Sequence, residues 1–276
     1  MAAGDVTVNI DSMGTIDPAG LWIPVAGTDY HSAGDNTNFS FITGSTNRAM
    51  TIAFWTLPKT ANIAAYRSFV SKDDVGSQRE WTIGTINSTQ VGAYIFGALD
   101  GTIVLGRRGT TVGYAKNTWV HYAITYDGST DSTGIKIYEN GVQIDDANDN
   151  TGTYATAVNG TEVMRIGDRS GASTGISGAY SDFRFYHKEL SAAEITDLYN
   201  GVFNDTKGLF AHYKFNDLTD SAGSHNLTAS GEGHLIAGSA ETIAQRMATN
   251  RTSVADEYLI APLPGGQFIN IFIDEA

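Results

Sequence analysis

The side chains that could do chemistry in this chain are loop carboxylates, six scattered histidines and one polar strand face. Asp182, Arg184 and Tyr186 alternate along one segment, so they share a face if it is a strand. A single carboxylate beside an arginine is typical of an ion pair. His121 has no Ser or Asp at a catalytic-motif spacing, and no histidine pair has the spacing of a zinc site. The chain has no cysteine, which excludes thiolate chemistry and disulfides.

Composition narrows the range of partners. The 276 residues include 17 Lys and Arg against 30 Asp and Glu, a net charge of −13. Nucleic-acid binding needs clustered Lys and Arg, so we expect no nucleic-acid partner. The acidity either keeps the protein in solution or supplies Ca²⁺ ligands. No apolar run is long enough to span a membrane, so we expect no membrane insertion. The first residues lack the basic and apolar regions of a signal peptide, and we expect none.

The positions of these residues depend on strands, and the clearest strands lie in residues 119–145. Apolar and polar side chains alternate from Trp119 to Tyr126, which is the period of a half-buried strand. Asn140-Gly141 is a strong hairpin signal, because a type I′ turn needs positive φ at both central residues. The hairpin places Ile137 opposite Ile144. These three antiparallel strands need a second sheet to cover their apolar face.

The rest of the chain has the same pattern and one clear helix. Ser191 and Glu194 form a capping box, and Leu190 with Ile195 forms a hydrophobic staple, so a short helix is expected to end near Gly201. Residues 239–250 could form a second short helix. Further strands are expected at 50–55, 68–72, 80–83, 92–96, 102–107, 163–167, 178–187, 208–215 and 267–273.

Several segments together resemble the laminin-G-like, concanavalin A-like lectin/glucanase family. They are 50–55 (MTIAFW), 69–72 (FVSK) with Trp81, 119–127 (WVHYAITYD), 137–142 (IYENGV), 166–167 (IG) and 178–199 (GAYSDFRFYHKELSAAEITDLY). The resemblance covers roughly residues 40–200. It implies an all-β fold, a two-sheet antiparallel jelly-roll sandwich with one or two short helices, and the strand pattern points to the same fold.

The chain departs from the family pattern in residues 208–223 (GLFAHYKFNDLTDSAG), which in relatives normally open the domain. A weak internal echo links them to residues 20–36, since Gly-Leu-Trp and Ser-Ala-Gly in the first copy match Gly-Leu-Phe and Ser-Ala-Gly in the second. Either the fold is permuted or residues 16–36 supply the first strand. We therefore expect an arm and edge strand in 1–38, the sandwich in 39–201, and a segment in 202–276 that completes it or mediates oligomerisation.

The resemblance also implies which sites to look for. Glucanases of this fold use carboxylates alternating on one strand, as in E-x-D-x-x-E, and this chain has no such triplet, so we expect no enzyme. The family often binds calcium through loop oxygens, and the alternative is that loop Asp and Asn serve turn chemistry. The calcium candidates are Asp127, Asp131, Asp145, Asp146, Asp149, Asp217 and Asp220. The candidates for stacking on a sugar are Tyr30, Tyr114 and Tyr154, whereas Trp55, Trp81 and Trp119 are expected in the core.

The sequence thus predicts a sandwich that binds rather than catalyses. Such domains normally work outside cells, and without an export signal the expected setting is a virion assembled in the host cytoplasm. The first hypothesis is a phage head decoration or tail-fibre module, which we expect to be a homo-oligomer and to bind virion proteins or cell-surface glycan. The alternatives are an extracellular carbohydrate-binding lectin module and a divergent polysaccharide hydrolase or lyase.

Overall fold

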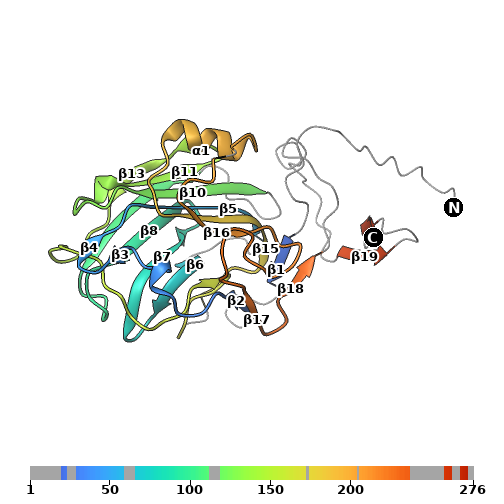
Figure 1. Cartoon of the computed structure of the whole chain (residues 1–276), viewed down its shortest axis with the longest axis horizontal. Helices are drawn as coiled ribbons and strands as arrows, with labels where there is room; N and C mark the ends of the chain where they lie inside the picture. Colours follow the sequence, from blue (N-terminus) through green and yellow to red (C-terminus); the bar gives the residue numbers. More distant parts are fainter. Residues whose placement is uncertain are drawn as a thin grey trace.

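A computed structural model describes residues 20–23, 29–58, 66–111, 119–171, 174–203, 205–236, 258–262 and 268–272. Two eight-stranded antiparallel sheets, called sheet A and sheet B, lie face to face (Figure 1). This arrangement confirms the predicted all-β sandwich. Each sheet collects strands from distant parts of the sequence, as a jelly roll requires.

Sheet A contains the predicted central meander. In order, its strands are β12 (Val142–Gln143), β11 (Ile135–Glu139), β10 (Val120–Tyr126), β5 (Met50–Pro58), β15 (Gly178–Tyr186), β1 (Gly20–Ile23) and β18 (His234–Ile236), and β16 (Leu209–Tyr213) also pairs with β15. Asn140 and Gly141 have φ values of 50° and 81°, as the predicted type I′ turn requires. The N–H of Ile144 donates to Ile137 O at 2.8 Å, so the predicted register is confirmed.

Sheet B contains the strands whose outer face matters below. In order, they are β13 (Asp145–Asn148), β9 (Val104–Thr110), β8 (Gln90–Phe96), β7 (Gln78–Asn87), β6 (Arg67–Asp74), β14 (Arg165–Ile166), β2 (Tyr30–Ser32) and β17 (Thr228–Ser230). The short pair β3 (Ile42–Thr43) and β4 (Thr46–Asn47) and the 3-10 helices η1 (Thr37–Phe39) and η2 (Ser132–Gly134) lie in the connections. The chain passes from sheet A to sheet B between β12 and β13.

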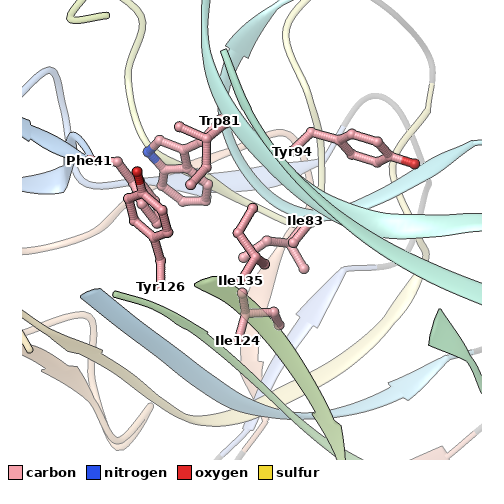
Figure 2. Close-up of a pocket in the computed structure, with 9 residues that line it drawn as sticks. Phe41, Trp81, Ile83, Tyr94, Ile124, Tyr126 and Ile135 are labelled. Carbon is pink, nitrogen blue, oxygen red and sulfur yellow. The ribbon is translucent and has the colours of Figure 1, made fainter. Parts of the chain in front are cut away.

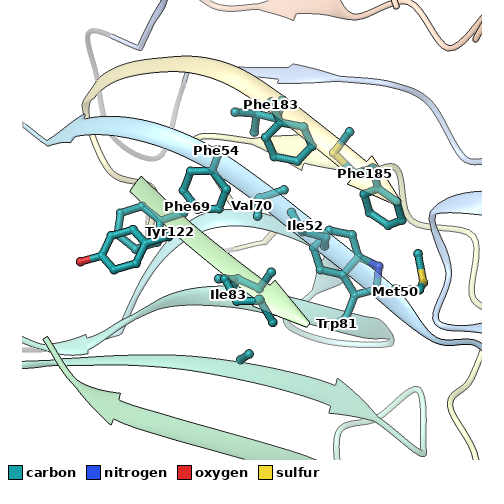
Figure 3. Close-up of a cluster of buried hydrophobic side chains, with 14 of the residues drawn as sticks. Met50, Ile52, Phe54, Phe69, Val70, Trp81, Ile83, Tyr122, Phe183 and Phe185 are labelled. Carbon is teal, nitrogen blue, oxygen red and sulfur yellow. The ribbon is translucent and has the colours of Figure 1, made fainter. Parts of the chain in front are cut away.

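Aromatic side chains from both sheets fill the space between them (Figure 3). Phe54 of β5 lies at the centre, with ring centroids 5.7 Å from Phe69 of β6 and 5.8 Å from Phe183 of β15. Trp81 is buried in this layer, as predicted. Trp55 is buried in a separate cluster with Tyr199 and Trp119, and Trp119 is half-buried. Because edge-to-face and offset contacts of this kind add to the burial of apolar area, this layer holds the two sheets together.

A small cavity of about 10 Å³ remains in this layer (Figure 2). Trp81 and Ile83 line it from sheet B, and Ile124 and Tyr126 line it from sheet A. An apolar cavity that could hold about one water molecule stays empty. This cavity is therefore a packing defect in the core and no ligand site.

Strands from both copies of the sequence echo pair with the same edge of strand β15. Its first residues pair with β1, where Tyr180 faces Leu21, and its last residues pair with β16, where Phe183 faces Tyr213. Residues 20–23 and 209–213 therefore lie one after the other along this edge of β15. Between the two halves, β15 bulges at Asp182, which has a φ of 49°.

The segment after residue 201 contributes to both sheets and then forms a sheet of its own. β16 and β18 extend sheet A, and β17 pairs with β2 at the edge of sheet B. The predicted strand at 267–273 is observed as β20 (Phe268–Phe272), which pairs with β19 (Tyr258–Pro262) in a separate two-stranded sheet. The possible helix at 239–250 lies outside the described residues.

Helix α1 (Ala192–Tyr199) covers part of the outer face of sheet A. The predicted capping box is present: Ser191 Oγ accepts from the Glu194 N–H at 3.3 Å, and Glu194 Oε2 accepts from the Ser191 N–H at 2.7 Å. Ile195 and Leu198 pack with Leu190 on Tyr186 and the neighbouring small residues of the sheet. The helix therefore begins where the sequence predicts.

We expect Ser191→Ala to lower the free energy of unfolding by about 1 kcal/mol, because it removes the oxygen that caps the helix. Urea unfolding followed by tryptophan fluorescence measures this change. Ser191→Asp, which restores a capping oxygen, serves as the control and should stay close to the original protein. Equal losses in both variants would contradict the capping role.

Candidate functional site

The predicted calcium ligands in the loops are held by turn hydrogen bonds. Asp127 accepts from the Ser129 N–H at 2.8 Å, Asp131 from the Thr133 N–H at 2.9 Å, and Asp217 from the Thr219 N–H at 2.8 Å. Each carboxylate caps a backbone N–H two residues further along the chain, which is the Asx-turn geometry. This is the alternative role that the sequence analysis left open.

The other acidic candidates also have protein partners. Asp145 pairs with Arg107 at 2.9 Å, and Asp146 accepts from the Thr110 hydroxyl at 2.8 Å. Asp220 accepts from several backbone N–H groups, including that of His212 at 2.9 Å. Burial acts to raise the pKa of Asp220, but these hydrogen bonds outweigh it and lower the pKa. Within the described residues, no three His, Asp or Glu side chains come together as a metal site. Calcium binding stays a prediction.

The three predicted sugar-stacking tyrosines have different surroundings. Tyr30 of β2 is half-buried, and the Arg165 guanidinium lies 4.3 Å from its ring centroid. Tyr154 is only 9% exposed, and its hydroxyl donates to Asn47 Oδ1 at 3.3 Å, so its ring has no free face for a sugar. Tyr114 lies outside the described residues. The structure does not bring Tyr30 and Tyr154 together.

Two other tyrosines do meet, on the outer face of sheet B. Tyr94 of β8 alternates with the core residues Ala93 and Ile95, and Figure 2 shows its side chain directed away from the apolar cavity. Tyr66, just before β6, lies 6.4 Å from Tyr94 between ring centroids. Its hydroxyl is 2.6 Å from the Thr82 hydroxyl of β7, the strand between them. Both tyrosines are half-buried. We call Tyr66, Thr82, Tyr94, Arg108 and Asp149 the tyrosine face.

Glycines make room for the Tyr94 ring. A Cβ atom at Gly92 would lie 2.7 Å from the Tyr94 ring, and one at Gly106, its register partner on β9, would lie 2.8 Å from it. Real Cβ contacts are never this short, so the ring lies close over the backbone of both strands. The sequence therefore builds a flat aromatic surface on the sheet, as when an aromatic side chain covers glycines in a neighbouring strand.

Polar groups flank this surface. The Tyr94 hydroxyl donates to Asp149 Oδ2 at 2.7 Å, and burial together with this hydrogen bond raises the pKa of Tyr94 above its ordinary value. Arg108 of β9 faces Gly92, and its Nε is buried and has no hydrogen-bond partner among the described residues. A buried donor without a partner is costly, which favours a ligand that accepts from it.

A second polar cluster adjoins Tyr66. Arg169 lies 5.4 Å from the Tyr66 ring centroid and pairs with Asp73 at 2.7 Å, and Asp73 also pairs with Arg79 at 3.1 Å. Asp168, which precedes Arg169 in the sequence, is buried, and one of its carboxylate oxygens has no hydrogen-bond partner among the residues described. Burial raises the pKa of Asp168 to about 6, in spite of opposing backbone hydrogen bonds and the nearby arginines.

Tyr66 and Tyr94 were not identified from the sequence as site residues. The sequence contains only part of the information needed to find them. The alternation of Gly92 and Tyr94 with apolar residues in β8 shows that both point outward. The pairing of β8 with β9 and of β6 with β7 is needed to bring Tyr66, Arg108 and Asp149 to the same place. The predicted ion pair of Asp182 with Arg184 is confirmed, at 2.9 Å.

Comparisons with known proteins agree with this architecture. The family model described as Concanavalin A-like lectin/glucanases superfamily matches residues 26–196. A comparison with curated proteins finds no match. Among the described residues, no helix is long and apolar enough to cross a membrane.

Solved structures with similar folds include a "putative carbohydrate binding protein" from Bacteroides ovatus, with 16% identity and a TM-score of 0.51 over 80% of this chain and 62% of that chain. The binding domain of Paraclostridial Mosquitocidal Protein 1 has 14% identity and a TM-score of 0.47 over 70% and 54%. A SAP-like pentraxin from Limulus polyphemus has 12% identity and a TM-score of 0.45 over 86% and 100%. The chain spans less than two thirds of the first two proteins.

The raised pKa of Asp168 gives a prediction for stability. The folded state holds the Asp168 proton more tightly than the unfolded chain, whose pKa is near 3.8, so ionisation destabilises the fold as the pH rises from about 4 to 6. We expect Asp168→Asn to raise the free energy of unfolding at pH 7.5 by about 1–3 kcal/mol. The gain should disappear near pH 4.

Denaturant unfolding between pH 4 and 7.5 measures this effect. Asp146→Asn is the matched control, since Asp146 is exposed and should show little change at any pH. A gain for Asp168→Asn that is the same at both ends of the pH range would contradict a buried charge at this position.

Proposed function

The chain belongs to the concanavalin A-like lectin/glucanases superfamily, and we propose that it is a non-catalytic protein that binds glycan across the tyrosine face of sheet B. The observation that carries this proposal is the pair of half-buried rings, Tyr66 and Tyr94, 6.4 Å apart beside the unpartnered Arg108 Nε. Sugar rings present apolar C–H faces and polar hydroxyl edges. Aromatic rings with a few well-placed polar groups are the matching surface.

The carboxylates near this face support binding rather than hydrolysis. Glycoside hydrolases need two carboxyl groups that can act as acid and as base or nucleophile. Here Asp149 accepts from the Tyr94 hydroxyl, and Asp73 is paired with two arginines. Asp73 therefore serves structure, and Asp149 positions an aromatic ring. These contacts favour a role in recognition.

Tyr94→Ala tests the glycan proposal. We expect it to weaken binding to glycan-array ligands at least tenfold, because stacking area and the contact with Asp149 are both lost. Tyr94→Phe keeps the ring and should retain most of the binding. Tyr154→Phe changes a buried tyrosine away from this face and is the control.

The array is probed with and without EGTA, which also tests the calcium prediction. Wild-type binding that Tyr94→Ala leaves unchanged would contradict the site. Release of reducing sugars from any bound polysaccharide would contradict the absence of catalysis.

A second proposal concerns the setting. We propose that the protein is a homo-oligomeric virion component, such as a head decoration or tail-fibre module, and an extracellular lectin module is the alternative. This role needs a means of attachment, and the hairpin of β19 and β20 supports it. The two strands form a separate sheet, in which the register pairs Leu259 with Ile271 and Tyr258 with Phe272. A two-stranded hairpin is marginal in water without further packing.

Ile271→Lys tests the attachment role in the full-length chain. We expect an oligomer in the original protein and a smaller mass by light scattering in the variant, because a charge on an apolar interface is costly. The control is Val142→Lys, since Val142 is exposed on the β11–β12 hairpin. A monomeric original protein would contradict the oligomer. Mass spectrometry of purified virions tests the setting itself.

A further inference from the structure

The outer face of sheet A has a group of polar and aromatic side chains that take no part in the tyrosine face of sheet B. Trp55 of β5, His121 of β10, Asp182 and Arg184 of β15, and His212 of β16 come from neighbouring strands. We call these five residues the sheet A patch. The register pairs His121 with Trp55 and Arg184 with His212, so the patch is continuous across the strands. It lies beside the area that helix α1 covers, because Ala53 and Ala123 of the same face pack against the helix.

Asp182 occupies a strained position within the patch. Its φ of 49° is uncommon for a residue other than glycine, and it marks the bulge of β15. The carboxylate is held in place: Asp182 Oδ1 accepts from Arg184 Nε at 2.9 Å and lies 2.7 Å from His212 Nε2. Local strain that the surroundings maintain is found most often at functional sites. The bulge aims one acidic side chain at two basic partners on the surface of the sheet.

The three polar side chains remain partly accessible. Side-chain exposure is 11% for Asp182, 20% for Arg184 and 12% for His212. Only Oδ1 of the Asp182 carboxylate has these hydrogen bonds. Arg184 uses Nε and also interacts with the Tyr186 hydroxyl, so its remaining terminal N–H groups can serve as further donors. The charges of Asp182 and Arg184 cancel. The patch therefore offers hydrogen-bond donors and acceptors around the charge-balanced pair of Asp182 and Arg184.

His121 adds a buried polar atom without a partner. It is 3% exposed, and its Nδ1 has no hydrogen-bond partner in the part of the chain that the structure describes. Burial lowers the pKa of His121 to about 4, so the ring is neutral at physiological pH. The ring lies 5.2 Å from Trp55 and 6.0 Å from Tyr199 at the end of α1, between centroids. Tyr199 and Trp119 are half-buried and pack on Trp55, so the patch has an aromatic side.

We propose that the sheet A patch is a second ligand site, which takes a neutral sugar or similar polyol. A hydroxyl group donates to Asp182 and accepts from Arg184, and the half-buried rings of Trp119 and Tyr199 contact the carbon skeleton, next to the buried His121 and Trp55. An ionic ligand would leave one member of the Asp182–Arg184 pair without compensation. The site lies on the opposite outer face from the tyrosine face, so it does not depend on the function proposed for sheet B.

Titration of the ¹⁵N-labelled full-length protein with glucose, galactose or N-acetylglucosamine tests this site. We expect saturable shifts of the His121 ring nitrogens and the Trp55 indole N–H below about 100 mM sugar, the range of a weak single-ring site. Asp182→Asn should weaken the sugar affinity about tenfold. Arg184→Lys is the second variant in case Asp182→Asn fails to fold, as judged by thermal unfolding.

Tyr94→Ala separates the two sites, because it lies on the other sheet and should leave the shifts at His121 and Trp55 unchanged. The absence of any saturable shift with these three sugars would overturn the proposal. Shifts at the patch that disappear in Tyr94→Ala, or that neither Asp182→Asn nor Arg184→Lys weakens, would overturn it as well. Loss of glycan-array binding in Tyr94→Ala with intact shifts at the patch supports both sites.

Discussion

The pairing of strand β15 on both of its edges is the constraint on which the other elements depend. One edge joins β5 over almost the full length of the strand, and the other is divided between β1 and β16. An edge left open would expose unpaired backbone groups, and the bulge at Asp182 lets the strand keep its partners while Phe183 and Phe185 enter the core. Strands β1 and β16, which are far apart in the sequence, are thereby both paired with β15. Sheet B packs on the face of sheet A to which β15 contributes.

The sequence was most informative where structure is set by neighbours along the chain. The type I′ turn at Asn140-Gly141 and the capping box of Ser191 and Glu194 depend only on nearby residues. The strand register around the turn and the start of the helix were both predicted. The candidate site could not be predicted in the same way. Tyr66 meets Tyr94 only because β7 pairs with both β6 and β8, and Arg108 comes from the next strand, β9. The burial of Tyr154 was missed for a related reason: its partners Asn47 and Tyr126 come from distant segments that a Gly-rich loop does not reveal.

The two outer faces differ in how they hold polar groups. On sheet B, glycines at 92 and 106 let a tyrosine ring lie against the backbone, and the sheet itself acts as the support. On sheet A, the polar side chains sit beside a capped helix, and their orientation comes from ion pairing at a backbone bulge. Both arrangements fix side chains on strands, which restricts their motion more than loops would. The acidic loops instead use their carboxylates to shape turns.

The pairing of β1 with β18 has a mechanical consequence. Gly20 and Ile236, the first and last described residues of the two sheets, face each other on this antiparallel pair. A pulling force applied through the two flanking segments would load the hydrogen bonds of this pair one after another, like a zipper, instead of all at once in shear. Such a geometry yields at low tension. If the protein is attached through only one of these segments, no force acts across the β1–β18 pair. The sandwich is then under tension only when a bound ligand pulls on it.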